Sequence, residues 1–268
     1  MNITIIKVGG AVVEDPSQLS VLLDSFVKVE GPKVLVHGGG RTATNMAKQL
    51  GIESKMVGGR RITDAEMLRV VTMVYGGLVN KNIVAQLQAR GINALGLTGA
   101  DLNVIRAHRR PITPEGIDFG FVGDVDSADG ARLLQLLNSG ITPVIAPLTH
   151  DGEGHLLNTN ADTIAQTIAT ALTDVVGGLS ADNFTLATSS SVTLTFCFEL
   201  IGVMRDPADT STLIPHLTES DFRTLVADGT IAGGMIPKLE NAFAALRAGV
   251  SSVRITNICD LQGGTLIE

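Results

Sequence analysis

Short apolar runs alternate along the chain with stretches whose apolar residues recur at helical spacing. The runs with the length and composition of buried strands are 3–8 (ITIIKV), 33–37 (KVLVH), 93–98, 142–147, 192–198 and 251–256. Continuous apolar strands separated by helices are typical of a mainly parallel sheet that is covered on both faces. The pattern therefore predicts an α/β fold.

Residues typical of helix ends punctuate the helical stretches. They are Asp15 with Pro16 at one start, Thr63 with Glu66 as a capping box for a long helix that ends before Gly91, and Thr218 for a helix that stops at Gly229. Scattered glycines and prolines with short alternating runs over 103–125 predict hairpins beside the main sheet.

A change in composition suggests two lobes. A helix is expected to end between Leu172 and Gly178, and residues 173–191 are rich in Gly, Ser, Thr, Asp and Asn, which is typical of an exposed connection. We therefore expect an N-terminal lobe at 1–173 and a C-terminal lobe at 174–268.

Composition and charge exclude several classes of protein. Hydrophobic residues make up 44% of the 268 residues and charged residues 18%, and no apolar run reaches the roughly 18 residues of a membrane span. The start of the chain has no targeting pattern, and Cys197 and Cys259 lack the spacing of a disulfide or zinc motif, so we expect a cytoplasmic protein. A net charge of −7, one tyrosine and no tryptophan disfavour nucleic acid as a partner.

Two glycine-rich turns indicate phosphate binding. Lys7 ends the first strand ahead of Gly9 and Gly10, and the second strand runs into Gly38, Gly39 and Gly40 before a helix. Glycine lets backbone N–H groups approach a ligand closely, and a helix N-terminus attracts anions. Tight structural turns are the alternative, but three ordered glycines cost roughly 1 kcal/mol each relative to alanine. Neither a dinucleotide fingerprint nor a P-loop motif is present.

Two further stretches carry polar residues at predicted helix starts. Asn158, Asn160 and Asp162 precede or open one helix, where Asn160 is a good N-cap and Asp162 also suits the helix dipole for structural reasons alone. Gly233 and Gly234 precede a helix expected to begin at Pro237 and Lys238. A lysine is unfavourable at that helix end, which suggests a bound anion, although a surface lysine is the alternative.

Together these stretches supply two lysines, a carboxylate able to hold them, and glycine turns at strand-to-helix junctions. Phosphoryl transfer asks the protein mainly for positioning, positive charge and N–H donors around the transferred group. The set is therefore typical of a phosphotransferase.

The same motifs resemble the amino acid kinase family, most closely its members that act on N-acylated glutamate. The matching stretches are 7–10 (KVGG), 37–40 (HGGG), 59–63 (GRRIT), 158–162 (NTNAD) and 233–238 (GGMIPK), in family order over nearly the whole chain. The resemblance implies an open three-layer αβα sandwich and ATP-dependent phosphorylation of the γ-carboxylate of an N-acylated glutamate, acetyl or succinyl, in arginine synthesis.

The resemblance also implies that the lobe at 1–173 binds the acylglutamate and forms the dimer, and that the lobe at 174–268 binds ATP. It implies roles for individual residues as well. Lys7, Lys238, Asp162, Gly10 and Gly40 would be catalytic, with the lysines flanking the phosphoryl group and Asp162 holding both. Gly39, Gly40, Arg61 and Asn158 would bind the substrate, whereas Arg60 is assigned to solvent. ATP would be bound by Glu199, Gly202, Ile231, Gly233 and Lys238. Mg²⁺ would arrive with ATP, so no dedicated protein metal site and no histidine ligand set is expected.

Two stretches depart from the family pattern. Where many members carry Ser-Asp-Val-x-Gly, this chain has Glu199, Leu200, Ile201 and Gly202. The segment between Leu172 and Val192 is longer than the family usually needs, and a flap or an oligomer contact would explain the extra length. Arginine-inhibited members carry a helix ahead of the first strand. This chain begins on that strand, so we expect a homodimer insensitive to arginine.

Other functions stay open from sequence. A kinase of the same fold could act on aminoadipate derivatives, aspartate, carbamate or UMP, although the Ser-Gly-Glu of uridylate kinases and the regulatory domain of aspartokinases are missing. A non-catalytic sensor would be expected to lose Lys7, Lys238 or Asp162, and a dehydrogenase would carry the dinucleotide fingerprint.

Overall fold

A computed structural model describes residues 1–178 and 190–268, and within these residues the strands form an eight-stranded sheet and two smaller sheets. The large sheet contains β1 (Asn2–Val8), β2 (Lys33–His37), β5 (Ala94–Leu97), β8 (Thr142–Ile145), β11 (Ser191–Phe198), β12 (His216–Leu217), β13 (Ser252–Asn257) and β14 (Thr265–Ile267). Their order is β12-β14-β13-β11-β1-β2-β8-β5, and only the β13–β14 pair among them is antiparallel.

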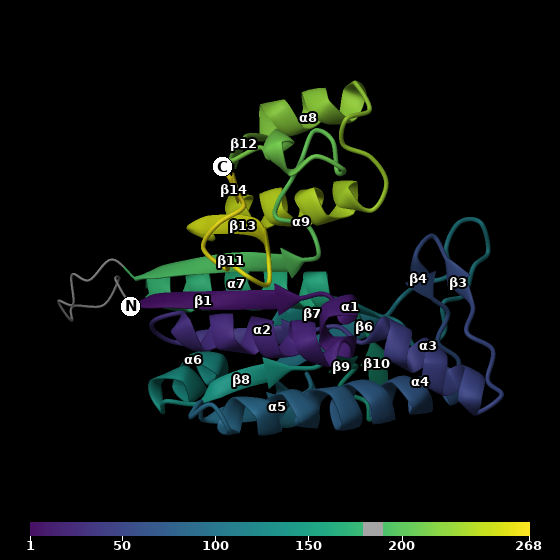
Figure 1. The fold of residues 1–268 in the computed structure, drawn as a ribbon. Helices are drawn as coiled ribbons and strands as arrows, with labels where there is room; N and C mark the ends of the chain where they lie inside the picture. Colours follow the sequence, from purple (N-terminus) through teal and green to yellow (C-terminus); the bar gives the residue numbers. More distant parts are fainter. Residues whose placement is uncertain (179–189) are drawn as a thin grey trace.

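Helices cover both faces of this sheet (Figure 1). One face carries α6 (Gly130–Asn138), α7 (Ala161–Gly178) and α9 (Met235–Arg247), with α8 (Glu219–Ala227) against α9. The other face carries α1 (Gly10–Glu14), α2 (Pro16–Lys28), α3 (Gly40–Gln49) and a long helical run made of α4 (Ala65–Val71), a π-helical segment (Thr72–Val79) and α5 (Asn80–Gln88). The expected αβα sandwich is confirmed.

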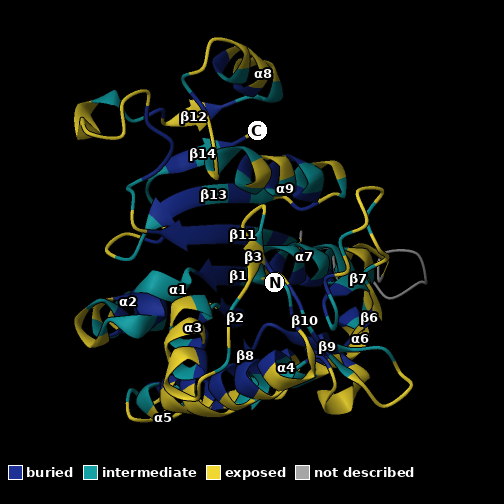
Figure 2. Cartoon of the chain, turned by 90° about the vertical axis from the view of Figure 1, so that its right-hand side faces the viewer, coloured by how far each residue is buried: buried dark blue, intermediate teal, exposed yellow. Residues whose placement is uncertain are grey.

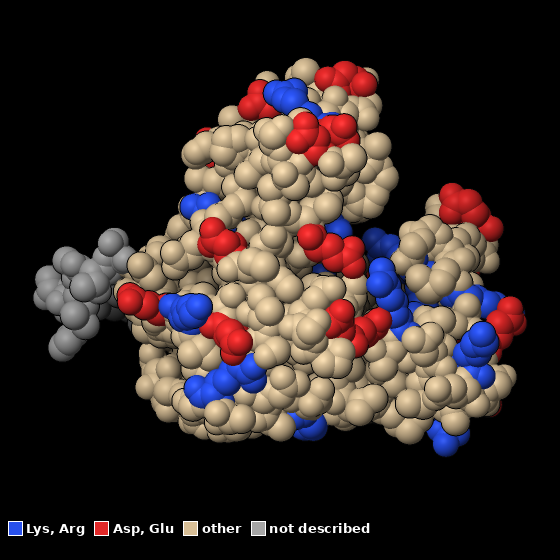
Figure 3. Space-filling model, in the orientation of Figure 1, with Lys and Arg blue, Asp and Glu red and all other residues tan. Residues whose placement is uncertain are grey.

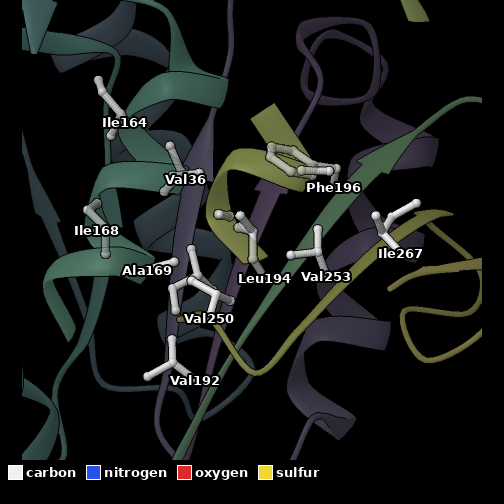
Figure 4. Close-up of a cluster of buried hydrophobic side chains, with 14 of the residues drawn as sticks. Val36, Ile164, Ile168, Ala169, Val192, Leu194, Phe196, Val250, Val253 and Ile267 are labelled. Carbon is white, nitrogen blue, oxygen red and sulfur yellow. The ribbon is translucent and has the colours of Figure 1, made fainter. Parts of the chain in front are cut away.

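Side chains of the strands alternate between the two cores, as strand geometry requires. Ile3 and Ile5 of β1 belong to the core beneath α7 and α9, whereas Ile6 and Val8 belong to the core on the opposite face. Figure 4 shows the first core where Ile164 and Ile168 of α7 lie close to Val36 of β2. Figure 2 shows the strands buried at the centre with exposed residues on the outer helix faces.

The smaller sheets lie beside the main one. β6 (Ile105–Arg109), β7 (Gly123–Ala128), β9 (Leu148–His150) and β10 (Leu156–Asn158) have the order β10-β9-β6-β7, in agreement with the hairpins expected over 103–125. β3 (Met56–Val57) and β4 (Arg60–Arg61) form a hairpin that projects beside α3 (Figure 1). Its turn residues Gly58 and Gly59 have φ values of 54° and 75°, which glycine adopts without strain.

Two predicted helix starts are wrong. Asp64, and not Thr63, caps α4, because its side chain accepts from Met67 N at 2.8 Å while the Thr63 hydroxyl instead accepts from Asn158 Nδ2 at 2.9 Å. Helix α9 begins at Met235, so Pro237 is its third residue. Proline is tolerated throughout the first helical turn, because the N–H it lacks has no partner there. The caps at Asp15 and Thr218 are confirmed.

The main sheet runs through both expected lobes. β1 pairs along its length with β11, and one core cluster contains residues from both sides of the 173/174 division. Helix α7 ends at Gly178, where the boundary was expected, but the division itself stays a prediction. Most of the polar 173–191 segment, with its expected flap or oligomer contact, lies outside the described residues. Within them, no helix has the length and apolar character that crossing a bilayer requires.

Candidate active site

A cavity of about 490 Å³ lies at the carboxyl ends of β1 and β11, where the starts of α1 and α3 meet. Its lining includes six of the residues singled out from the sequence: Lys7, Gly10, Gly40, Arg61, Glu199 and Lys238. Crevices at the carboxyl ends of parallel strands are the usual ligand sites of open α/β sheets. Figure 3 shows lysine and arginine side chains in a recess between the C-terminal elements and the β3–β4 hairpin.

Lys7 and Asp162 form an ion pair at one wall of this cavity. Lys7 Nζ lies 2.8 Å from Asp162 Oδ1, and both side chains are largely buried. Oδ1 is shielded from water and has no aligned hydrogen-bond donor among the described residues, so the contact is Coulombic. Asp162 therefore fixes the Lys7 ammonium by charge.

Asp162 was expected to hold both lysines; it forms its ion pair with Lys7 and acts on Lys238 through charge without a direct contact. Among the described residues no ion pair joins Lys238 to a carboxylate, and its Nζ lies 3.7 Å from the centroid of the Phe198 ring, which attracts a cation. Burial, and then the neighbouring Lys7 charge, lower the pKa of the Lys238 amine. Lys7 Nζ lies 5.0 Å from the same ring. Both ammonium groups thus lie near the Phe198 ring, and the Asp162 and Glu199 carboxylates both act on the Lys238 charge. Because Glu199 also pairs with Arg41, the group as a whole keeps a net positive charge for an anion.

Two helix N-termini open into the cavity without side-chain caps. Gly10 begins α1 and Gly40 begins α3, and no hydrogen bond from either backbone N is present among the described residues. The Thr42 N–H of α3 is already taken by Glu14 Oε1 at 2.6 Å. The first N–H groups of a helix lack partners within it and attract anions. Within the described part of the chain, Gly10 and Gly40 therefore present unpaired N–H groups at this cavity.

Two of the three consecutive glycines, Gly38 and Gly39, have a steric reason. A Cβ on Gly38 would lie 2.8 Å from Gly10 N, and one on Gly39 would lie 3.0 Å from a carbon of the Tyr75 ring. A Cβ on Gly40 would meet nothing nearer than Arg61 Nη2 at 3.8 Å. Gly38 lets two backbone turns touch, Gly39 fits beneath the aromatic ring, and Gly40 faces the cavity.

A buried histidine supports the glycine turn from behind. His37 is fully buried, its Nδ1 lies 2.8 Å from Gly38 O, and its Nε2 lies 3.1 Å from Asn80 Nδ2. Because the carbonyl needs a donor and the amide nitrogen is one, Nδ1 carries the proton. Burial lowers the pKa of His37 to about 4, so it stays neutral and has a structural role.

A second cavity of about 200 Å³ adjoins the first and shares Gly40, Met56 and Arg61 with it. Arg61 is buried, and its guanidinium donates to Gly40 O and Thr44 Oγ1, each at 2.9 Å, and also to Ser54 Oγ. Three of its five N–H donors are thus used by these oxygens, and the guanidinium also interacts with the Tyr75 hydroxyl, so at most two donors are left for a ligand. Arg61 ties the hairpin to the start of α3 at the border between the cavities.

Asn158 and Asn160 line this second cavity, together with Tyr75 and Thr159. Asn158 ends β10 and donates to Thr63 Oγ1 at 2.9 Å, while Asn160 caps α7 by accepting from Asp162 N at 2.7 Å. Arg60 is exposed, as expected, but it lines the second cavity as well. The assignment of Arg60 to solvent alone is therefore incomplete.

The residues expected to bind ATP fall into two groups. Glu199 and Lys238 line the first cavity, and Glu199 lies 3.9 Å from Arg41 in an exposed ion pair. Gly202, Ile231 and Gly233 do not line it. Gly202 and Ile231 are buried, and a Cβ on Gly202 would lie 2.5 Å from Leu213, so this glycine serves close packing.

Among the described residues, one cluster of side chains could hold a metal ion by its geometry, and it lies outside both cavities. It consists of Asp151, Glu153 and His155 at the β9–β10 turn, where His155 Nδ1 lies 2.7 Å from Asp151 Oδ2. The donors of the first cavity are mainly ammonium groups and N–H groups, which suit phosphate oxygens and not a metal cage.

Sequence reasoning missed Phe198, Tyr75 and Arg110 as site residues. Phe198 follows the buried run of β11 and looks like one more core residue, and nothing local indicates that two lysines meet on its ring. Tyr75 lies in the π-helical segment, far along the chain from the glycines that it covers. The one signal in the sequence was that Tyr75 is the only tyrosine of the chain.

The comparisons with known proteins agree with this geometry. The model of the amino acid kinase family matches residues 2–174 and 184–257. Acetylglutamate kinase of Bacteroides thetaiotaomicron is 59% identical, with 95% of this chain and 93% of that protein covered. Acetylglutamate kinase of Phocaeicola vulgatus is also 59% identical, with 98% and 96% covered. The crystal structure of smu.665 from Streptococcus mutans superposes with a TM-score of 0.74 at 26% identity, covering 99% of this chain and 98% of that one.

Proposed function

The chain belongs to the amino acid kinase family, and on that premise we propose that it phosphorylates the γ-carboxylate of N-acetyl-L-glutamate with ATP. The product is N-acetyl-L-glutamyl 5-phosphate, an intermediate of arginine biosynthesis. One observation carries the proposal: Lys7, Lys238 and two uncapped helix N-termini line the same cavity. The relatives named acetylglutamate kinase supply the acceptor.

In this account the protein positions charges and does little covalent chemistry. A γ-carboxylate oxygen attacks the γ-phosphorus of ATP, the bond from that phosphorus to the bridging oxygen breaks, and ADP leaves. The carboxylate is already ionised at neutral pH, so no base is required. Lys7 and Lys238 stabilise the charge on the transferring group, and the Gly10 and Gly40 N–H groups donate to its oxygens.

The remaining residues orient the reactants. Asp162 holds Lys7 by their ion pair, and the ring of Phe198 holds Lys238. The free donors of Arg61, with Asn158 and the backbone at Gly39 and Gly40, bind the acylglutamate across the border between the cavities. On the nucleotide side we propose Glu199, Gly202, Ile231 and Gly233. Mg²⁺ would come with ATP and neutralise part of its phosphate charge.

The test is an assay of ADP release with Mg-ATP and N-acetyl-L-glutamate, run beside unacylated L-glutamate as the matched control. We expect release that depends on the acylated compound. Equal release with L-glutamate, or no release with N-acetyl-L-glutamate from a folded protein, would contradict the proposal.

We propose that the protein is a cytoplasmic homodimer. β5 lies at one edge of the main sheet, and Leu95 on β5 and Met73 and Leu78 on the neighbouring helical run are exposed by 37%, 55% and 56%. Exposed apolar side chains beside an open sheet edge favour association with a second chain. Light scattering should give a mass near twice 28.0 kDa, and Leu78→Glu should lower it. A mass of 28.0 kDa at all concentrations would rule the dimer out.

A further inference from the structure

The second cavity carries more positive charge than the proposed substrate needs. Its lining holds Arg60, Arg61 and Arg110 against a single carboxylate, Asp124. Three guanidinium groups and one carboxylate leave a local charge of +2. This excess is notable in a chain whose net charge is −7.

Two of these four groups neutralise each other. Arg110 Nε lies 3.1 Å from both carboxylate oxygens of Asp124, and Arg110 Nη2 contacts Oδ1 as well. Arg110 also lies over the Phe119 ring at 5.5 Å, and 17% of its side chain is exposed. The pair is therefore a fixed part of the cavity wall.

Arg60 has no such partner. Among residues 1–178 and 190–268, no hydrogen bond or ion pair joins its side chain to another residue, although the exposed Arg109 and Arg132 each pair with an aspartate. Partial burial and the nearby Arg110 charge lower the pKa of Arg60, while Asp124 opposes this. Its guanidinium thus lies close enough to the Arg110–Asp124 pair to feel both charges.

The substrate proposed above accounts for only one of the two remaining positive charges. Its γ-carboxylate belongs at the first cavity, beside the lysines, and its α-carboxylate matches the free donors of Arg61 at the border. Arg60 lines the second cavity and not the first, so the ATP phosphates do not account for it. A neutral acetyl group would leave Arg60 without a counterion.

We infer that the second cavity accepts an N-acyl group that ends in a carboxylate, with Arg60 binding that carboxylate beside the Arg110–Asp124 pair. The inference rests on the proposed function, since it assigns the acyl end of the same substrate. The enzyme then turns over dicarboxylic N-acylglutamates with a higher kcat/KM than N-acetyl-L-glutamate. A guanidinium suits this task because its planar fork matches a carboxylate with two parallel hydrogen bonds.

The experiment compares three probes with the full-length protein and Mg-ATP. N-succinyl-L-glutamate carries the terminal carboxylate, N-succinamoyl-L-glutamate replaces it with a neutral amide of the same shape, and N-acetyl-L-glutamate lacks it. We expect kcat/KM for the succinyl probe to exceed that for the other two by about 10- to 100-fold, the usual value of a charge-assisted hydrogen bond. Arg60→Ala should abolish most of this preference by lowering kcat/KM for the succinyl probe.

The surface variant Arg223→Ala on α8, where Arg223 pairs with Glu219, is the matched control and should keep the preference. Protection of the protein from thermal unfolding by each probe without ATP gives a readout independent of turnover. Equal kcat/KM for the succinyl and succinamoyl probes, or a preference that survives Arg60→Ala, overturns the inference while the proposed function stands. Failure to turn over any probe overturns the proposed function instead.

Discussion

Replacing Lys238 with alanine is expected to lower kcat by a factor on the order of 10² to 10³, as the loss of a charge-stabilising donor does at other phosphoryl and acyl transfer sites. The Lys238 ammonium is held over the Phe198 ring without a carboxylate of its own, so its charge is available to the transferring group. The residue does not line the second cavity, where the acyl end would bind. KM for N-acetyl-L-glutamate should therefore change little.

Steady-state kinetics with both substrates varied would check this result. Lys28→Ala, which removes an exposed lysine at the end of α2, is the matched control and should behave as the parent protein. Turnover within about threefold of the parent, in a Lys238→Ala protein that still unfolds cooperatively, would remove Lys238 from the account.

Lys7→Ala should lower kcat to a similar extent, but it also leaves Asp162 unpaired in a largely buried place. Asp162→Asn separates the two effects, because it keeps both lysines and removes only the charge that holds Lys7. A fall in kcat with little change in KM would mark Asp162 as a positioning residue. A rise in KM alone would place it in substrate binding.

Replacing Gly38 with alanine should damage both stability and activity. The new methyl carbon would lie 2.8 Å from Gly10 N and 3.1 Å from Gly10 Cα, and backbone atoms cannot move aside as a flexible side chain would. Overpacking of this kind costs about 1–3 kcal/mol of unfolding free energy. Because the displaced residue is Gly10, we also expect kcat to fall by about 10- to 100-fold.

Urea unfolding and kinetics measured on the same preparation would check both parts. Gly177→Ala, near the end of α7, is the matched control, since no atom lies within 4 Å of its new Cβ, and alanine is the better helix former. A Gly38→Ala protein with the stability and turnover of its parent would show that the two turns do not need their close contact.

Much of the fold could be predicted from sequence because its signals are local. The apolar runs of β1, β2, β8, β11 and β13 are buried on both sides, and such runs are hard to confuse with amphipathic helices. Asp15 and Thr218 cap their helices through hydrogen bonds to residues that follow them closely in the sequence. The predicted cap at Thr63 was wrong because Asn158, which is distant in the sequence, donates a hydrogen bond to that hydroxyl.

The candidate site shows the same difference between local signals and contacts that are distant in the sequence. Glycines and lysines at strand ends could be found because each strand end of a parallel sheet points to one edge, which brings Lys7, Gly10 and Gly40 together. How Lys238 is held could not be found, since the Phe198 ring acts through contacts between residues 40 positions apart. The charge of the second cavity depends likewise on Arg60, Arg110 and Asp124, which three different segments supply.

Transfer of the phosphoryl group to the γ-carboxylate is shown most directly by trapping the acyl phosphate that it forms. Hydroxylamine, added to the protein with Mg-ATP and N-acetyl-L-glutamate, should convert a γ-acyl phosphate into the corresponding hydroxamate in an amount equal to the ADP formed. We expect this equality for the parent protein, and almost no hydroxamate from Lys238→Ala. ADP formed without hydroxamate would mean that water, and not the γ-carboxylate, accepts the phosphoryl group, and would contradict the account.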